Sequence, residues 1–252
     1  SSMSSKAQWA ALTAHLADDY RIIALDLLGY GAAPFPAGAT GPDSADYAHT
    51  LAHEVDAIDA VLARELAPGE PFHLIGHSYG GASALHLARR MPERLLSLAL
   101  HEPVAFHLLA HDDPARAEIV SVVASINACA SDRDATRIFI DYWNRPGAFD
   151  AAPPSAQDKM IAMIAKVRLD FQALLGEPVT LADLAGLQVR TLVMAGQHSP
   201  GSTRGLAPQL AGALPNGTAL VTRGAHMGPI THAAAINPVI AAFLRGEDVA
   251  AA

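Results

Sequence analysis

The sequence has a single cysteine, Cys129, and charged residues make up only 17% of its 252 positions. One cysteine cannot form a disulfide within the chain, and it does not define a zinc site without further cysteine or clustered histidine ligands. The net charge is −8, and lysines and arginines do not cluster, which argues against a nucleic-acid partner or an anionic membrane. We expect no metal and no cofactor.

Long apolar runs are also missing. No stretch approaches the ~18 apolar residues of a membrane span, and the Ser-rich start has no signal-peptide pattern. Hydrophobic residues nevertheless make up 51% of the chain, which is enough for a large core. We therefore predict a globular α/β protein, with the cytoplasm as its default location.

Apolar runs and helical patterns alternate through much of the chain. Such alternation with short connections is typical of a mostly parallel sheet that helices cover on both faces. The predicted strands are 21–26, 72–76, 95–100, 189–195 and 218–222, and the predicted helices between and around them are 6–16, 47–66, 79–91, 203–214 and 233–244.

The alternation stops in the middle of the chain. Residues 104–186 show only helical patterns, interrupted by Pro-Gly and Pro-Pro breaks. We therefore predict a core from residues 1–103 and 187–252, and a helical insertion, 104–186, that lies over the sheet. The insertion is rich in aromatic and methionine side chains, which favours a substrate with a modest hydrophobic part.

One motif points to nucleophilic chemistry. Residues 76–80 read Gly-His-Ser-Tyr-Gly, a G-x-S-x-G motif between a predicted strand and a predicted helix. This is the setting of a nucleophile elbow, a sharp turn that exposes a reactive serine. Gly76, Gly80 and Gly81 would leave room for the turn. The pattern predicts Ser78 as the nucleophile and the backbone N–H of Tyr79 as a donor to developing negative charge.

A serine hydroxyl needs a positioned base, and the chain offers 12 histidines. His226 directly follows the last predicted strand and a short turn. Residues just beyond the carboxyl ends of parallel strands gather at the ligand crevice, which favours His226 as the base. His198 and His232 remain weaker alternatives.

Three motifs in this order resemble the α/β-hydrolase superfamily: Asp26-x-x-Gly29-x-Gly31, the segment from Gly76 to Gly80, and the segment from Gly224 to Pro229. The resemblance implies an α/β-hydrolase fold with residues 104–186 as a helical cap. It also implies a serine hydrolase that forms an acyl-enzyme, with a small carboxylic ester as the expected substrate. Hydrolysis of C–C, amide or lactone bonds and acyl transfer remain open, whereas haloalkane dehalogenation is disfavoured because it uses a carboxylate at the elbow.

The chain departs from the family pattern at the triad acid. The family usually carries an aspartate after the strand that matches 189–195, but this chain has Ser199 at the corresponding place. Some members carry the acid after the strand that follows the elbow helix, and here that strand ends at Glu102. The resemblance therefore suggests Ser78, His226 and Glu102 as the triad. Asp26 is a weaker candidate because it matches a structural turn of the family.

The family also supplies a second oxyanion donor from a loop ahead of the helix that matches 6–16. The resemblance implies that this chain begins within that loop, so that N-terminal strands of the fold are missing from it. The backbone N–H of Ser2, or else of Met3, is then expected to complete the oxyanion hole. Proteolytic processing would leave a short N-terminal fragment of the same protein bound at an apolar sheet edge.

A different class of function stays open. Without an aspartate after the strand at 189–195, the chain could be a ligand-binding protein on a hydrolase scaffold with an idle triad. Labelling of Ser78 by a fluorophosphonate would separate an enzyme from such a receptor-like protein.

Overall fold

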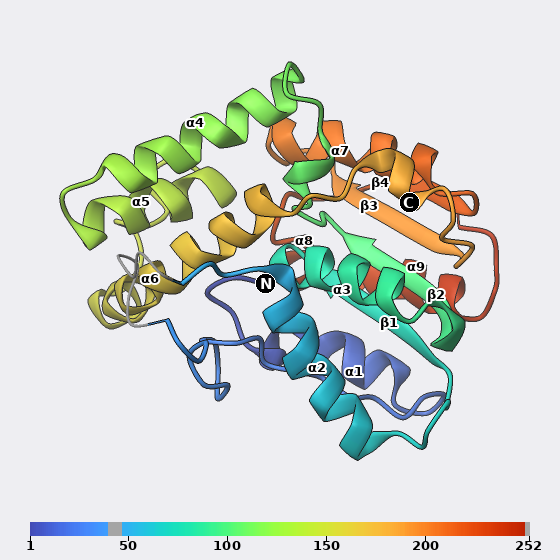
Figure 1. The fold of residues 1–252 in the computed structure, drawn as a ribbon. Helices are drawn as coiled ribbons and strands as arrows, with labels where there is room; N and C mark the ends of the chain where they lie inside the picture. The colour runs from blue at the N-terminus through green and yellow to red at the C-terminus, as the bar shows by residue number, and fades with distance from the viewer. Residues whose placement is uncertain (40–46, 250–252) are drawn as a thin grey trace.

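The computed structural model describes residues 1–39 and 47–249. A parallel sheet of four strands forms its centre, in the order β1 (Phe72–His77), β2 (Leu95–His101), β3 (Thr191–Gly196) and β4 (Gly217–Thr222). Because every pairing is parallel, the carboxyl ends of the four strands meet at one edge of the sheet. The parallel α/β architecture expected from the sequence is confirmed (Figure 1).

Helices cover both faces of this sheet (Figure 1). They are α1 (Ala10–Leu16), α2 (Leu51–Glu65), α3 (Tyr79–Arg90), α7 (Gly201–Ala213), α8 (Gly228–Thr231) and α9 (Ala233–Leu244). The strands alternate between two cores: Leu98 and Leu100 of β2 pack into the core that holds α3 and α7, whereas Ala99 packs into the core of α1 and α9. Successive side chains of a strand point to opposite faces, so burial on both faces explains the continuous apolar runs.

Residues 104–190 contain helices and no strand, namely α4 (Pro114–Ala128), α5 (Asp132–Trp143), α6 (Pro154–Gly176) and short 3₁₀ turns. Figure 1 shows α4, α5 and α6 gathered on one side of the sheet. The Asp113 side chain caps α4 and the Ser131 side chain caps α5, each by accepting a backbone N–H of the first turn. None of the described helices, the 23-residue α6 included, is long and apolar enough to cross a membrane.

The prediction of a strand at residues 21–26 is wrong. This segment forms neither a helix nor a strand, and no described strand pairs with the free edge of β1. A cavity of about 400 Å³ is lined by residues 21–25, by all of β1 and by residues of α1 and α2. An apolar run becomes a strand only when a neighbouring backbone takes up its hydrogen bonds, and no described strand pairs with this segment.

Candidate active site

Ser78 occupies the tight turn between β1 and α3, as the motif predicts. Its φ angle is 55°, in the left-handed region that L side chains rarely adopt. A β-carbon on Gly76 would stand 2.6 Å from the Gly80 carbonyl oxygen, and one on Gly81 would stand 2.9 Å from Pro103 Cα. Both positions therefore require glycine. The expectation for Gly80 is wrong, because a β-carbon there would meet only ordinary contacts, the nearest at 3.5 Å.

The strand register brings Ser78 and Glu102 to the same edge of the sheet. His77 and His101, the last residues of β1 and β2, pair with each other, and Ser78 and Glu102 follow them directly. The Ser78 N–H donates to the His101 carbonyl oxygen at 3.1 Å, and the Glu102 N–H donates to the Met194 carbonyl oxygen at 2.8 Å. Two neighbouring strand ends thus hold the two side chains in fixed positions.

His226 lies between them, in the loop that connects β4 to α8. Its Nε2 is 2.9 Å from Ser78 Oγ, and its Nδ1 is 2.7 Å from Glu102 Oε2. A carboxylate only accepts hydrogen bonds, so Nδ1 carries the proton and Nε2 is free to accept from the serine hydroxyl. All three residues are buried. The two weaker candidates, His198 and His232, are exposed and lie outside this chain of hydrogen bonds.

Glu102 is held by donors on both of its oxygens. Oε1 accepts the Gly196 backbone N–H at 2.7 Å and the Ser199 hydroxyl, while Oε2 faces His226. Burial by itself would raise the pKa of the Glu102 carboxyl, but the hydrogen bond and charge of His226 outweigh it and lower the pKa to about 2. The group is therefore ionised at neutral pH. Ser199, at the place where the family usually has its acid, here donates a hydrogen bond to Glu102.

Unusual backbone conformation concentrates at this site. Among the residues that the structure describes, Met3, Ser78 and Glu102 are the ones other than glycine with positive φ, at 53°, 55° and 45°. Such conformations cost free energy and persist only where the surrounding structure enforces them, and they cluster at functional sites. Two of the three are the predicted nucleophile and the predicted acid. The third lies in the segment predicted to complete the oxyanion hole.

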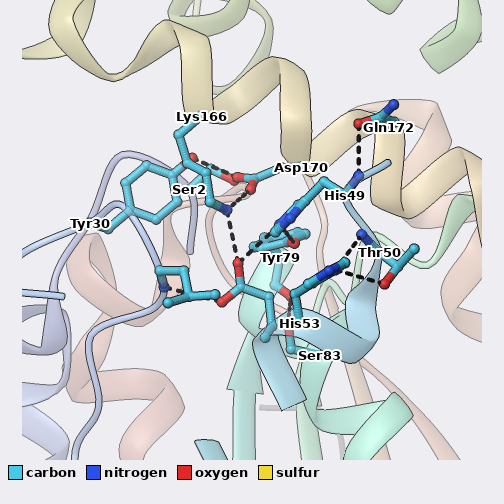
Figure 2. A network of polar contacts seen from close by, with 12 residues as sticks. Ser2, Tyr30, His49, Thr50, His53, Tyr79, Ser83, Lys166, Asp170 and Gln172 are labelled. Atoms are coloured by element: carbon cyan, nitrogen blue, oxygen red, sulfur yellow. Dashed lines mark hydrogen bonds and ion pairs between the residues drawn. The ribbon is translucent and has the colours of Figure 1, made fainter. Parts of the chain in front are cut away.

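The two predicted oxyanion donors have different surroundings. Tyr79 is the first residue of α3, so its N–H has no acceptor within the helix. The segment that contains Ser2 lies near the elbow, because the Ser1 nitrogen would be 3.9 Å from a β-carbon on Gly80. The Ser2 side chain donates to Asp170 Oδ2 at 2.5 Å (Figure 2). The role of its backbone N–H stays a prediction.

Aromatic residues from α5 cover the site. The Trp143 ring lies against the His226 imidazole with centroids 4.0 Å apart, and it also packs on Phe106 and Phe139. Ser78 is only 6% exposed and His226 only 2%. The core–cap division remains a prediction, but residues of the predicted cap clearly reach the predicted catalytic centre.

Asp26, the weaker acid candidate, holds a loop instead. Its carboxylate accepts the Lys6 N–H at 2.6 Å and the Ala32 N–H at 3.0 Å. Gly31 packs so closely on this carboxylate that a β-carbon there would lie 2.3 Å from Asp26 Cγ. These contacts join the loop after residue 26 to the start of the first helical turn, which agrees with a structural role.

A second buried polar cluster was not predicted from the sequence. Lys166 on α6 forms ion pairs with Asp170 and, at 2.9 Å, with Glu54 on α2 (Figure 2). Tyr30 donates to Asp170 at 2.6 Å, and His49 lies 3.4 Å from Glu54. Burial lowers the pKa of the Lys166 amine, but the two carboxylates outweigh this and raise it, so the amine stays charged.

This ion cluster (Glu54, Lys166, Asp170 and their neighbours) contains one grouping of metal-ligand type. Donor atoms of His49, Glu54 and Asp170 lie within 4.8 Å of one another. The Lys166 ammonium bonds both carboxylates, however, and so already occupies the position that a cation would take. The only sequence signal for the cluster was the i, i+4 spacing of Lys166 and Asp170 on one helix face.

Comparison with known proteins identifies the fold family of this chain. A family model described as alpha/beta hydrolase fold matches residues 3–233. A fluoroacetate dehalogenase from Burkholderia sp. is 34% identical over 102 residues, which are 40% of this chain and 31% of that protein. The matched region spans less than a third of the length of this relative, and the same holds for six further curated relatives.

Two solved structures share the fold over nearly the whole chain. A hydrolase from Pseudomonas aeruginosa PA01 superposes with a TM-score of 0.72 at 22% identity, covering 96% of this chain and 87% of that one. An esterase from Exiguobacterium antarcticum has a TM-score of 0.71 at 16% identity, with 96% and 88% covered. At these identities the likeness concerns the fold.

Proposed function

The chain belongs to the alpha/beta hydrolase fold family, and on this basis we propose that it is a serine hydrolase that cleaves small carboxylic esters. The observation that carries the proposal is the unbroken series of hydrogen bonds from Ser78 through His226 to Glu102. Nucleophile, base and orienting acid in this order are what acyl transfer requires.

In the first half of the reaction, Ser78 Oγ attacks the carbonyl carbon of the ester while His226 Nε2 takes its proton. Negative charge moves to the carbonyl oxygen, which the backbone N–H groups of Tyr79 and Ser2 stabilise. The tetrahedral intermediate collapses, the proton on Nε2 passes to the departing alkoxide, and an alcohol leaves. The acyl group remains bonded to Ser78.

In the second half, water replaces the alcohol. His226 Nε2 takes a proton from the water as its oxygen attacks the acyl carbon, and then returns this proton to Ser78 Oγ as the carboxylic acid departs. In both halves the imidazole becomes positively charged for a time. Glu102 keeps its negative charge and stabilises the imidazolium through the 2.7 Å contact with Nδ1.

The structure favours an ester over a halide as the substrate. The nucleophile proposed for the elbow is a serine hydroxyl, whereas the dehalogenation chemistry considered above uses a carboxylate there. The Trp143 ring next to His226, with Phe106 and Phe139 packed on it, favours an ester with a modest apolar acyl or alkyl part.

A fluorophosphonate probe and a series of p-nitrophenyl esters of increasing acyl length test the proposal. We expect covalent labelling at Ser78 and release of p-nitrophenol. Ser78→Ala should abolish labelling and lower kcat by about 10⁶-fold, the loss that removal of a triad nucleophile produces. Ser83→Ala is the matched control, because Ser83 is a buried serine of α3, the helix that follows Ser78, and its hydroxyl donates to the Tyr79 carbonyl oxygen at 2.9 Å. A folded wild-type protein that is not labelled would contradict the proposal.

A further inference from the structure

His77, the residue before the proposed nucleophile, makes contacts that the reaction as described does not use. Its side chain is buried at the end of β1, and its Nε2 lies 2.8 Å from the backbone carbonyl oxygen of His226. Its Nδ1 lies 3.2 Å from the side-chain amide of Gln8. The imidazole therefore bridges the first helical turn of the chain and the loop that carries the proposed base.

The contact with His226 fixes the protonation of this ring. A carbonyl oxygen only accepts, so Nε2 must carry the hydrogen and Nδ1 must accept one. The Gln8 amide satisfies this when its NH₂ group faces Nδ1, and its oxygen then accepts from Trp9 Nε1 at 3.2 Å. Burial, together with the neighbouring imidazoles of His226 and His101, lowers the pKa of His77 well below its ordinary value, so the ring stays neutral.

We propose that His77 is a positioning residue that holds His226 in reach of Ser78 by donating a hydrogen bond to the His226 backbone carbonyl. This inference rests on the proposed function. Two adjacent residues of the elbow then hold the base from both ends: Ser78 Oγ meets the ring at 2.9 Å, and His77 Nε2 holds the main chain at 2.8 Å. The turn that carries His77 and Ser78 therefore contacts both the main chain and the ring of His226.

The contact joins an irregular loop to a rigid strand. The loop from 223 to 227 has no strand or helix to fix it, whereas β1 is anchored along its length to β2. A bond from the rigid strand end to the loop carbonyl transfers this rigidity to His226. A misplacement of about 1 Å between reacting groups can cost about 100-fold in rate.

Three variants separate positioning from general destabilisation. His77→Gln keeps an N–H donor at nearly the reach of Nε2, whereas the amide of His77→Asn ends one bond short of it and still leaves a polar group in the buried site. His73→Leu is the matched control: His73 is also a histidine of β1, and its Nδ1 bonds Ser97 Oγ at 2.7 Å, away from His226. Folding of each protein is checked by thermal unfolding.

The readouts are the rate of fluorophosphonate labelling at Ser78 and kcat and KM for a p-nitrophenyl ester. We expect His77→Asn to lower labelling and kcat by about 10- to 100-fold with little change in KM, because the effect falls on the alignment of the base. His77→Gln should recover most of this loss, and His73→Leu should label as the wild type does. Equal labelling of folded His77→Asn and wild type would overturn the inference.

A measurement that does not depend on activity keeps this result apart from the proposed function. In a protein with ¹⁵N-labelled histidine, NMR should show His77 as the neutral Nε2–H tautomer, and His77→Asn should change the ring signals of His226. If the wild type is not labelled at Ser78, the proposed function fails, and the NMR result still decides the contact. Protonation of His77 at Nδ1 alone would refute it.

Discussion

Two buried polar clusters of this protein balance their charge in different ways. In the reaction cluster (Ser78, His226 and Glu102), the carboxylate accepts from the Gly196 N–H and the Ser199 hydroxyl and contacts the His226 ring, with no lysine or arginine among its described contacts. In the ion cluster, Glu54 and Asp170 share the permanent cation of Lys166 (Figure 2). Both clusters lie between elements that are distant in sequence.

The difference indicates what each cluster can do. Glu102 has no permanent cation among its described contacts, so the positive charge that it best stabilises is one that forms on His226 during a reaction. Lys166 already neutralises its two carboxylates, so the ion cluster gains nothing from a new charge. We infer that the first cluster serves chemistry and that the second joins α6 to α2.

The largest effect is expected when Glu102 of the reaction cluster loses its charge. Glu102→Gln retains an oxygen that can accept from Gly196 and Ser199, so the fold should survive, but it removes the charge that stabilises the imidazolium. We expect kcat for an ester to fall on the order of 10⁴-fold, as with comparable changes in triad enzymes. Steady-state kinetics on folded protein measures this, and a change of less than tenfold would place the acid elsewhere.

A second substitution sharpens this prediction. Because Ser199 Oγ contacts Glu102 Oε1, Ser199→Asp in the Glu102→Gln background returns a carboxylate to the reaction cluster. We expect part of the lost kcat to return. Ser199→Ala in the same background should give no recovery.

The next largest effect concerns stability at the ion cluster. Lys166→Met leaves Glu54 and Asp170 buried without their cation, and we expect a loss of about 3–5 kcal/mol in the free energy of unfolding. Urea denaturation measures it. Labelling of Ser78 in the folded fraction should fall far less than in Glu102→Gln.

The neutral triple variant E54Q/K166M/D170N is the control for this loss. It removes all three charges and keeps similar shapes, and most of the stability lost by Lys166→Met should return. If the triple variant is as unstable as the single one, the shape of Lys166 matters more than its charge.

The smallest effect is a pH dependence that separates the clusters. The pKa of Glu102 is lowered to about 2 from an ordinary 4.5, so its contribution to stability is present above about pH 4.5 and is lost as the pH falls toward 2. The pKa of Lys166 is raised above its ordinary 10.5, so its contribution is present below that pH and is lost at higher pH. Thermal unfolding across pH should show a weaker acid limb in Glu102→Gln and a weaker alkaline limb in E54Q/K166M/D170N.

Local signals explain most of what the sequence predicted. The elbow around Ser78 depends on a strand, a turn and a helix that are contiguous in the chain, so a short motif is sufficient to find it. His226 and Glu102 each follow a strand end, and parallel strands bring such ends together. The structure places these side chains in contact, while their catalytic roles remain the proposal made above.

The features that the sequence did not predict correctly all depend on contacts between residues far apart in the chain. Residues 21–26 have the composition of a buried strand, but a strand also needs a partner, and no described strand pairs with this segment. The ion pair of Lys166 with Glu54 joins residues 112 positions apart, which no periodicity reveals. The contact from His77 to the His226 carbonyl spans 149 positions and involves a backbone atom, which carries no sequence signal.

The indole of Trp143 lies against the imidazole of His226, with 4.0 Å between the ring centroids. Because Ser78 is 6% exposed and His226 2%, the proposed function requires neighbouring side chains to move before an ester can reach the serine. Under that proposal, the cycle includes an opening step that involves no bond making. Where that step is slower than acyl transfer, substitutions of Trp143 change kcat without altering the reacting groups.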